Sequence, residues 1–519
     1  MTSKLSLDQG VVDACREAAV RIAAQVAEAI GGKTSVSVER AIARLLGVDG
    51  VNDLGVPLPN VLVDHLHDRG RLGKGVAYWL GNAMLALELS PQAIAEGVSV
   101  GDLDLQGLAL AEEPAIKGRI TLETERRIAT ISALRESRRT MRLELGESAP
   151  PHRYVLTATG NVYDDVVHAK AVAEAGGDIV AVIRSTAQSL LDYVPFGPTT
   201  EGYGGTFATQ ANFKIMREEL DEWSRAHGRY MRLSSFCSGL CMSEIAVMGA
   251  LEGLDNMVND ALYGILYRDI NIVRGLIDQR VSRMINGYFE VVINTGEDNY
   301  LRTADAVQAA SSVTASQFIN HRLAHDSGVP DAQIALGNAF EIDPQVTNGL
   351  LFEWAQAQLA RELFPDCPVK FMPPTKHMDG NLFRTHASDT LFNLVTVATG
   401  QSIQTIGVPT EGIFTPHIHD RVLGLESVNY VFNSARDLYE EIWFKPGGII
   451  QTRAQDVLLR ASELLEEIAD VGLFEAIANG TFGDVSRRLD EGRGIEGIVP
   501  AEEGYLNPVV ELMREASYV

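Results

Sequence analysis

The fold of this chain is best indicated by the stretch DIVAVIRSTAQSLLDYVPFGPTTEGYGGT, residues 178–206. It begins with an apolar, β-branched run, residues 179–183, which is typical of a strand buried on both faces. The run turns polar at Arg184, so we expect a site at the end of the strand. Beyond it, Ser189 and the glycine-rich segment 202–205 can bring backbone N–H groups close to an anion. We interpret the loop as phosphate-binding; an ordinary βα loop remains the alternative, because no standard nucleotide fingerprint is present.

Further apolar runs of the same kind alternate with helical patterns along the middle of the chain. The eight runs are YVLTATG (154–160), DIVAVIR (178–184), YMRLSSF (230–236), ALYGILY (261–267), FEVVINT (289–295), QIALGNA (333–339), PVKFMPP (368–374) and SIQTIGVP (402–409). Eight strands that alternate with helices favour an α/β fold of the (β/α)₈ TIM-barrel type over an open doubly wound sheet.

The regions on either side of these runs have helical patterns instead. Residues 1–150 form an expected helical N-terminal accessory region, in which the charges of residues 123–142 favour a solvated face. Residues 151–420 form the expected barrel, and residues 421–519 a second helical accessory region. The C-terminal tail has little reason to stand alone, so we expect it to pack on the barrel or on the N-terminal helices.

Composition excludes several classes of function. The formal net charge of −25 over 519 residues argues against nucleic-acid binding, which needs a basic surface. No apolar stretch is long enough to cross a bilayer, so no membrane partner is expected. The N-terminus lacks a secretory pattern, and the four scattered cysteines form no disulfide framework. These features predict a cytoplasmic protein.

Nearly every apolar run is followed by side chains that can do chemistry. In a barrel these loops converge on one rim, where such folds keep their active sites. The seventh run itself contains Lys370. The residues at the ends of the runs are Thr159 and Asn161, Arg184 and Ser189, Ser235 and Ser238, Arg268 and Asp269, Glu297, Asp298 and Asn299, Asn338, Lys376 and His377, and Thr410 and Glu411.

These residue types suit a phosphorylated aromatic cofactor that holds an amino acid. Arginine and serine hydroxyls bind phosphate, a tyrosine stacks on a ring, and paired cations and carboxylates bind a zwitterion. Pyridoxal phosphate with an amino-acid substrate is the simplest pair of ligands that accounts for all these residue types. The tyrosine in question, Tyr263, lies in an apolar run and could equally be plain core.

Longer strings carry a resemblance to a known family. The strings are VPLPN, TATGN, VIRSTAQSLLDYVPFG, TTEGYGGTFATQ, CSGLCM, NDALYGILYRDIN, INTGEDNYL and PPTKHM. They resemble the large α subunit of the lysine 5,6-aminomutase family, which depends on adenosylcobalamin and pyridoxal phosphate and also includes D-ornithine 4,5-aminomutase. The resemblance implies an isomerase with a pyridoxal-phosphate-binding barrel. It also implies that the N- and C-terminal helical accessory regions wrap around this barrel as a clamp. That isomerase moves the terminal amino group of D-lysine or L-β-lysine from C6 to C5 by a radical mechanism.

The resemblance also implies roles for individual residues. Arg184 and Ser189 would hold the cofactor phosphate, and Tyr263 would stack on the pyridine ring. Ser238 and Asn299 would donate or accept hydrogen bonds at the ring substituents. Arg268, Asp298 and Lys370 would contact the charged ends of the substrate. Glu411 would contact the adenosyl ribose.

A partner chain follows from the same resemblance. Base-off cobalamin proteins carry a D-x-H-x-x-G loop, and neither HLHDRG (65–70) nor PHIHDR (416–421) has that spacing. In the family, a small β subunit supplies the cobalamin domain and the Schiff-base lysine, so we expect an α₂β₂ assembly. Lys370 and Lys376 are then not the imine lysines. We expect no metal at His377, His386, His417 or His419.

Three alternatives remain open from the sequence. The first is the same chemistry on D-ornithine, although that large subunit usually includes the cobalamin domain. The second is a cobalamin-independent barrel lyase or aldolase that uses Lys370 or Lys376 as a Schiff-base residue. The third is a non-catalytic subunit that only scaffolds its partner.

Overall fold

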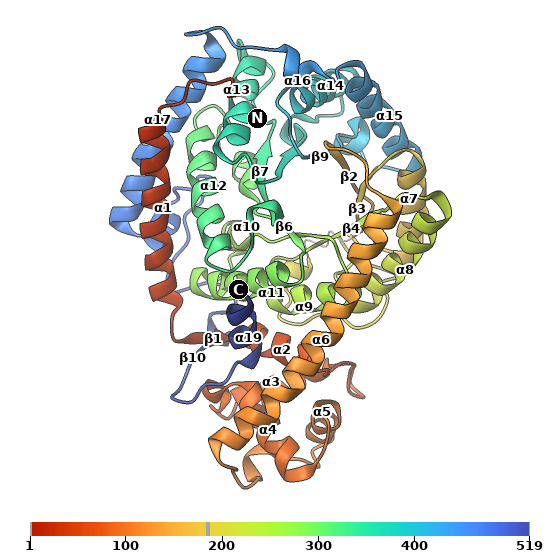
Figure 1. Cartoon of the computed structure of the whole chain (residues 1–519), viewed down its shortest axis with the longest axis vertical. Coiled ribbons are helices and arrows are strands. Elements are labelled where there is room, and N and C mark those ends of the chain that lie inside the picture. Colours follow the sequence, from red (N-terminus) through yellow and green to blue (C-terminus); the bar gives the residue numbers. More distant parts are fainter. Residues whose placement is uncertain (1–2, 183–186, 518–519) are drawn as a thin grey trace.

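The centre of the molecule is a closed barrel of parallel strands (Figure 1). The structure is a computed structural model, which describes the backbone of residues 3–182 and 187–517 and the side chains as far as residue 514. Within this part, the barrel strands follow one another in chain order, and β2 closes on β9 through the pair Tyr154 and Thr405. The strands are β2 (His152–Leu156), β3 (Ile179–Ala181), β4 (Arg232–Phe236), β5 (Asn256–Val258), β6 (Val292–Asn294), β7 (Ile334–Ala339), β8 (Val369–Met372) and β9 (Ile403–Thr405). The expected (β/α)₈ barrel is confirmed.

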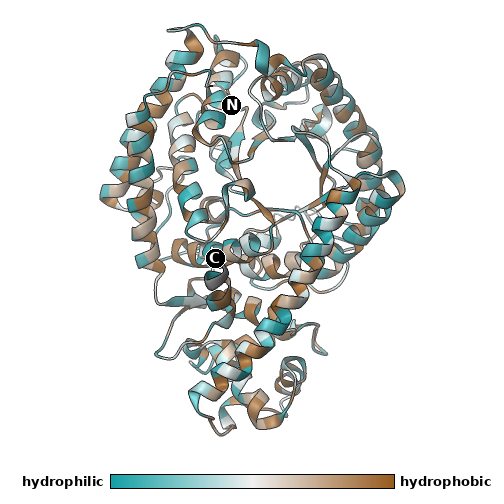
Figure 2. Ribbon diagram, viewed as in Figure 1, coloured by the Kyte–Doolittle hydropathy of each residue, from teal (hydrophilic) through white to brown (hydrophobic). Residues whose placement is uncertain are grey.

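Helices after each strand form a ring around the barrel. They show mixed brown and teal stretches (Figure 2), as expected for helices with one face on the strands and the other toward solvent. The ring helices are α7 (Val162–Glu174), α8 (Gln210–His227), α9 (Met242–Glu252), α10 (Ala261–Arg268), α11 (Ile272–Tyr288), α12 (Ala310–His325), α13 (Gly349–Leu363), α14 (Leu382–Ala398) and α15 (Ile418–Ser434). The barrel end that we placed at residue 420 falls inside α15.

The prediction of the fourth strand is wrong. ALYGILY (261–267) forms helix α10, and the fourth barrel strand is the short segment 256–258 before it. The side chain of Asp260 accepts a hydrogen bond from the backbone N–H of Leu262 and so caps the helix. Most of the helix is buried, so its sequence is apolar on nearly every side. A short apolar run of this kind does not separate a buried helix from a buried strand.

The two accessory regions pack against each other as well as on the barrel. Strand β1 pairs antiparallel with β10, and α1 packs with α17 against α12 and α13 (Figure 1). The N-terminal elements are α1 (Gln9–Ile30), β1 (Lys33–Ser35), α2 (Val36–Leu45), α3 (Leu58–His67), α4 (Val76–Leu87), α5 (Pro91–Ser99) and α6 (Glu113–Leu145). The C-terminal elements are α16 (Leu438–Glu441), α17 (Ile449–Val471), α18 (Leu473–Ala478), β10 (Ile498–Pro500) and α19 (Pro508–Ser517).

Helix α6 contacts the barrel through charges that we expected to face solvent. The guanidinium of Arg142 lies 2.6 Å from a carboxylate oxygen of Asp255, which directly precedes β5. Arg138 pairs with Asp221 on α8, and Arg135 donates to the backbone carbonyl of Tyr288. The helix is therefore solvent-facing only in part, because these three arginines dock it on the barrel.

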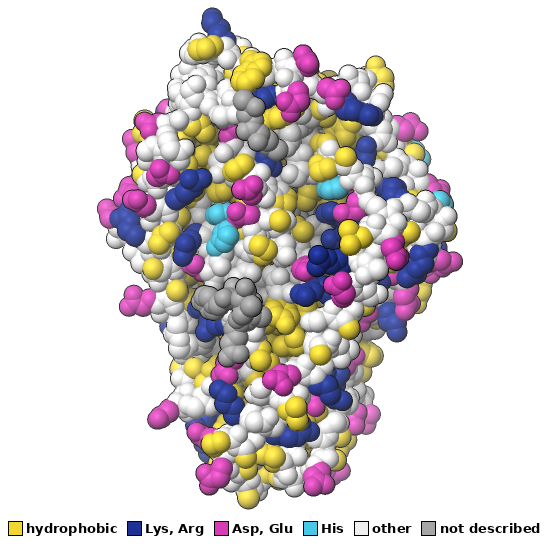
Figure 3. Space-filling view, viewed as in Figure 1, with side chains coloured by type: hydrophobic (Ala, Val, Ile, Leu, Met, Phe, Trp, Pro, Cys, Tyr) yellow, Lys and Arg dark blue, Asp and Glu magenta, His cyan; other side chains and the backbone are white. Residues whose placement is uncertain are grey.

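The surface shows mixed charge. In the space-filling view, acidic and basic side chains are interspersed over the visible face (Figure 3). None of the helices in the described ranges combines the length and apolar character that a membrane span requires. All four cysteines are buried and unpaired, as expected for a chain without disulfides.

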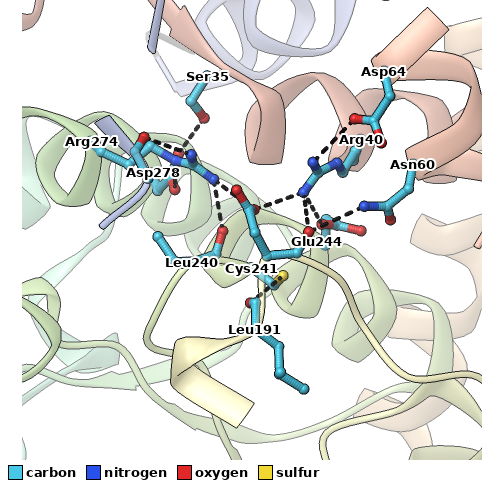
Figure 4. Close-up of polar contacts among 12 residues, drawn as sticks. Ser35, Arg40, Asn60, Asp64, Leu191, Leu240, Cys241, Glu244, Arg274 and Asp278 are labelled. Atoms are coloured by element: carbon cyan, nitrogen blue, oxygen red, sulfur yellow. Dashed lines mark hydrogen bonds and ion pairs between the residues drawn. The ribbon is translucent and has the colours of Figure 1, made fainter. Parts of the chain in front are cut away.

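A buried ion-pair network joins the accessory regions to the barrel (Figure 4). Arg274 on α11 is fully buried; its Nε donates to Asp278 at 2.8 Å, and its guanidinium also contacts Asp192 at 3.1 Å. Arg40 on α2 donates to Asp192 at 2.7 Å. The hydroxyl of Ser35, the last residue of β1, donates to Asp278. The carboxylates therefore serve both the barrel and the N-terminal region.

We expect Arg274→Met to destabilise the protein strongly. The change leaves two carboxylates without their shared cation, and breaking a buried pair costs about 3–5 kcal/mol of unfolding free energy. Urea titration followed by circular dichroism measures the effect. The matched control is Arg21→Met, since Arg21 forms an exposed pair with Glu466 and should leave the midpoint nearly unchanged. Equal midpoints for the two variants would contradict the importance of the network.

Candidate functional site

A cavity of about 570 Å³ opens at the carboxyl ends of the barrel strands. Its size is in the range of small-molecule and cofactor sites. Its main polar and aromatic lining comes from the ends of several strands and the loops after them: Tyr154, Thr159, Tyr263, Asn294, Asp298, Asn299, Arg302, Lys370, Thr375, Thr405, Glu411 and Arg421. The cavity therefore lies where a barrel of this type keeps its active site.

Five of the nine residues to which the resemblance gives an individual role line this cavity, in addition to Thr159. They are Tyr263, Asp298, Asn299, Lys370 and Glu411. Tyr263 lies on α10 after β5, Asp298 and Asn299 in the turn after β6, Lys370 in β8, and Glu411 in the turn after β9. Closure of the barrel brings these four segments together. The glycine-rich segment also reaches the cavity through Gly202, Gly204 and Gly205.

Four other expected residues are placed differently. Arg184 lies outside the described residues. Ser189 and Ser238 are buried in adjoining loops that pack on each other, since a Cβ on Gly239 would lie 2.5 Å from the Cα of Ser189. Neither serine lines the cavity, and neither does Arg268.

Arg268 contacts the cavity only through Tyr263. Its guanidinium donates to the hydroxyl of Tyr263 at 2.6 Å and lies 5.0 Å from the centre of that ring. Phe236 packs edge-on against the same ring, with centroids 5.7 Å apart. The Tyr263 ring is thus half-buried and held from two sides, which leaves part of it facing the cavity. Such an arrangement presents an aromatic ring for stacking.

A lysine and an aspartate that influence each other electrostatically both line the barrel mouth. Lys370 is buried in β8, and its ammonium lies 4.8 Å from the centre of the Tyr154 ring. Burial raises the pKa of Asp298, while Lys370 and Arg302 act in the opposite direction. Gly337 in β7 makes room for this carboxylate, because a Cβ there would lie 2.5 Å from Oδ1 of Asp298.

Two further buried carboxyl groups lie behind Asp298. Burial, together with the nearby Glu297 and Asp298, raises the pKa of Asp260 to about 8. Burial also raises the pKa of Glu297 to about 7, although Glu297 accepts hydrogen bonds from Thr295 at 2.6 Å and from the Gly337 backbone at 2.8 Å. Three acids in so small a volume cannot all ionise cheaply, so this layer holds protons near neutral pH.

The glycine-rich segment is folded onto the loop that follows β2. The backbone N–H of Gly202 donates to the carbonyl of Gly160 at 2.6 Å, and a Cβ on Gly160 would lie 2.5 Å from the Gly202 carbonyl oxygen. Asp165 accepts hydrogen bonds from the Thr206 hydroxyl and, at 2.7 Å, from the Thr159 backbone. Two loops that are far apart in sequence are thereby fixed at one edge of the cavity.

Two cations of the cavity were not identified from the sequence. Arg302 ends the 3₁₀ turn Glu297–Arg302, and Arg421 lies on α15, where its Nε donates to the carbonyl of Leu156 at 2.8 Å. The string GEDNYLR could have indicated Arg302, because it continues the loop that carries Asp298. Arg421 falls just beyond residue 420, where we ended the barrel. The cavity therefore combines three cations with the carboxylates of Asp298 and Glu411.

Several buried polar atoms near the cavity have no hydrogen-bond partner within the described ranges. They include both side-chain polar atoms of Asn294 and the hydroxyls of Thr405 and Ser238. Buried polar groups are normally paired with protein, water or ligand. The barrel mouth is thus suited to a polar ligand with an aromatic part, beside Tyr263.

Comparison with known proteins agrees with this site. Residues 5–512 match the family model described as the D-lysine 5,6-aminomutase TIM-barrel domain of the alpha subunit. The chain belongs to this family.

Near-full-length relatives carry the corresponding name. The lysine 5,6-aminomutase alpha subunit of Fusobacterium nucleatum subsp. nucleatum is 52% identical over 511 residues, which is 98% of this chain and 99% of that protein. The protein of the same name from Acetoanaerobium sticklandii is 51% identical over 514 residues, 98% of each chain. A more distant relative is the D-ornithine 4,5-aminomutase subunit beta of the latter organism, 26% identical over 68% of this chain and 49% of that one.

We expect Asp260→Asn to remove a pH dependence of stability. The folded pKa of Asp260, about 8, lies above its unfolded value of about 3.9, so the native state binds the proton more tightly. The wild-type unfolding free energy should therefore fall as pH rises from about 4 to about 8. This group contributes at most about 1.4 kcal/mol of that loss per pH unit. The asparagine variant, which retains a helix cap, should gain stability relative to wild type between pH 5 and 8. Urea midpoints at several pH values measure this gain, and a difference that stays constant, as expected for the exposed control Asp13→Asn, would contradict it.

We expect Gly337→Ala to lower the stability of the protein, because the added methyl group would crowd Asp298 inside the barrel. The added Cβ would lie 2.5 Å from Oδ1 of Asp298 and 2.9 Å from the backbone N of Glu297. Such overpacking costs about 1–3 kcal/mol of unfolding free energy. The control is Gly118→Ala in α6, where a Cβ has no neighbour within 4 Å and helix propensity favours alanine. Thermal unfolding should show a lower midpoint for the first variant only.

Proposed function

We propose that this chain is the α subunit of an adenosylcobalamin- and pyridoxal-phosphate-dependent isomerase. It would move the terminal amino group of D-lysine or L-β-lysine from C6 to C5. The observation that carries the proposal is the match to lysine 5,6-aminomutase alpha subunits over 98% of the chain, in a barrel whose cavity combines a half-buried tyrosine with mixed charges.

The residues around the cavity fit pyridoxal phosphate. Tyr263 would stack on the pyridine ring, and Asn299 would hydrogen-bond a ring substituent. Ser238 would add a second such bond; it does not line the cavity, and its hydroxyl has no hydrogen-bond partner among the described residues. Ser189 and Arg184 would hold the phosphate; Ser189 is buried outside the cavity lining, and Arg184 lies outside the described residues. When bound, the cofactor supplies a conjugated system that delocalises an unpaired electron during the amino shift.

The charged residues would hold the substrate and keep it in one orientation. Lys370 and Arg302 can bind a carboxylate, and Asp298 can bind an ammonium group. Arg268 would act through Tyr263, whose hydroxyl it contacts. Asp298 and Arg302 come from the 3₁₀ turn after β6 and Lys370 from β8, and closure of the barrel brings them to one cavity. Fixed charges in a confined cavity are what positioning of a reactive intermediate demands.

The remaining components would come from a second chain. We propose a small β subunit that carries the cobalamin domain and the lysine that forms the imine, in an α₂β₂ assembly in the cytoplasm. The names of the relatives support a partner, since both are called alpha subunits. Glu411 lines the cavity edge and would contact the adenosyl ribose. A cytoplasmic location agrees with the four unpaired cysteines.

The decisive test is isomerisation by the assembled enzyme. The chain is co-expressed with a neighbouring gene that encodes a D-x-H-x-x-G protein, loaded with both cofactors, and assayed with D-lysine, L-β-lysine and D-ornithine. We expect 2,5-diamino or 3,5-diamino products from the first two. Conversion of D-ornithine alone, or of no substrate by a complex that holds both cofactors, would overturn the proposal.

Tyr263→Ala should lower kcat/KM of this complex by about 10²-fold or more, because the stacked ring positions the cofactor. Tyr263→Phe keeps the ring and loses only the hydroxyl contact with Arg268, so a smaller loss, within about tenfold, is expected. Tyr430→Ala is the matched control, since Tyr430 is 75% exposed on α15. Equal activity of the Tyr263→Ala variant and this control would contradict the stacking role.

A further inference from the structure

A second group of chemically active side chains lies at the other end of the barrel from the cavity. His321 and His325 are in the last two turns of α12, and Asp331 begins the 3₁₀ turn directly before β7. Cys367 lies in the turn directly before β8, which pairs with β7. The four residues therefore gather at the amino ends of two neighbouring strands, whereas the cavity lies at the carboxyl ends.

The metal-binding atoms of His321, Asp331 and Cys367 converge, and His325 contacts the Asp331 carboxylate of this group. Nε2 of His321 lies 2.8 Å from Oδ1 of Asp331, and Nε2 of His325 lies 2.5 Å from the same oxygen. The Sγ of Cys367, the Nε2 of His321 and a carboxylate oxygen of Asp331 are all within 4.8 Å of one another. Two histidines four residues apart on a helix present their rings on one face, which is a common spacing of zinc ligands.

The surrounding residues hold these side chains in place. The Phe364 ring packs against the ring of His321, with centroids 5.2 Å apart. The buried Arg361 donates to the carbonyls of Phe364 at 2.5 Å and Pro365 at 2.6 Å, which fixes the turn that carries Cys367. Outer contacts of this kind orient the ligands of metal sites.

We propose that His321, His325, Asp331 and Cys367 form a four-coordinate Zn²⁺ site. Imidazole, thiolate and carboxylate are the ligands that zinc prefers, and one thiolate with one carboxylate neutralises the ion. On binding, the thiol proton leaves to solvent. Each neutral imidazole moves its proton from Nε2, which donates to Asp331 in the absence of metal, to Nδ1 by exchange with solvent, so that Nε2 can bind the ion. The hydrogen bonds to Asp331 are thereby replaced by metal–ligand bonds. The protein fills all four positions, so the ion is structural and ties the end of α12 to the starts of β7 and β8.

Burial differs among the ligands in a way that allows metal to enter. Cys367 is 2% exposed, which protects the thiolate from oxidation. The side chains of His321 and His325 are 27% and 40% exposed, so one side of the cluster faces solvent. A hydrogen-bonded cluster without metal is the competing account, and the two differ in measurable metal content.

The test uses the untagged full-length chain, so that no affinity tag contributes ligands. The protein is incubated with one equivalent of Zn²⁺, dialysed, and analysed by inductively coupled plasma mass spectrometry. We expect one zinc per chain, and an X-ray absorption spectrum with one sulfur at about 2.3 Å and three nitrogen or oxygen ligands at about 2.0–2.2 Å. Wild-type protein that retains no zinc at micromolar concentration would overturn the proposal.

Three variants separate coordination from folding. Cys367→Ser should weaken zinc binding at least tenfold, and His325→Gln should do the same at a position exposed enough to leave the fold intact. Cys15→Ser is the matched control, because Cys15 is a buried cysteine outside the cluster. A chelator should lower the thermal midpoint of wild type and of the control, but not that of His325→Gln. Zinc retained equally by all three variants would refute the site.

Discussion

The fully buried guanidinium of Arg274 is the group on which the arrangement of this molecule depends. It belongs to ring helix α11, yet it donates to Asp278 on the same helix, to Asp192 after β3, to the Leu240 carbonyl after β4 and to the Gly494 carbonyl near the C-terminus. Asp278 also accepts from Ser35 of the N-terminal region. A charge placed this deep is tolerable only when all its partners are present. One side chain therefore requires two barrel loops and both accessory regions to be in place together.

This constraint reaches the candidate site through Asp192. That residue follows Ser189 by three positions, in the loop that we expect to hold a phosphate. Burial alone would raise the pKa of Asp192, but Arg274 and Arg40 hold it below its usual range, so the carboxylate stays charged and paired. Because Arg40 comes from accessory helix α2, the loop is held from outside the barrel as well as from within. The accessory regions thus belong to the framework of the site, and the barrel alone lacks part of it.

The barrel could be predicted because parallel strands are buried on both faces. Such strands appear as short apolar runs, as in DIVAVIR and in QIALGNA, whose segment 334–339 is buried throughout. The run ALYGILY misled the prediction because a buried helix is equally apolar, whereas the true strand at 256–258 is three residues long and flanked by polar groups. The ion pairs of α6 were unpredictable for another reason. Arginines at helical spacing look alike whether their partners are water or, as for Arg142, an aspartate on a distant segment.

The sequence could predict which loops meet at the rim of the barrel. It could not predict which side chains on those loops point into the cavity. The rule that polar residues follow barrel strands brought Asp298, Asn299 and Lys370 to one cavity, since closure of the barrel places all the carboxyl ends together. Whether a side chain points into that cavity depends on the local backbone. Had residues 261–267 been a strand, Arg268 would have followed it at the rim; as the last residue of a helix, it instead reaches back one turn to the Tyr263 hydroxyl. The pair then acts as a unit in which the cation orients the ring, and spacing along the chain alone does not reveal this.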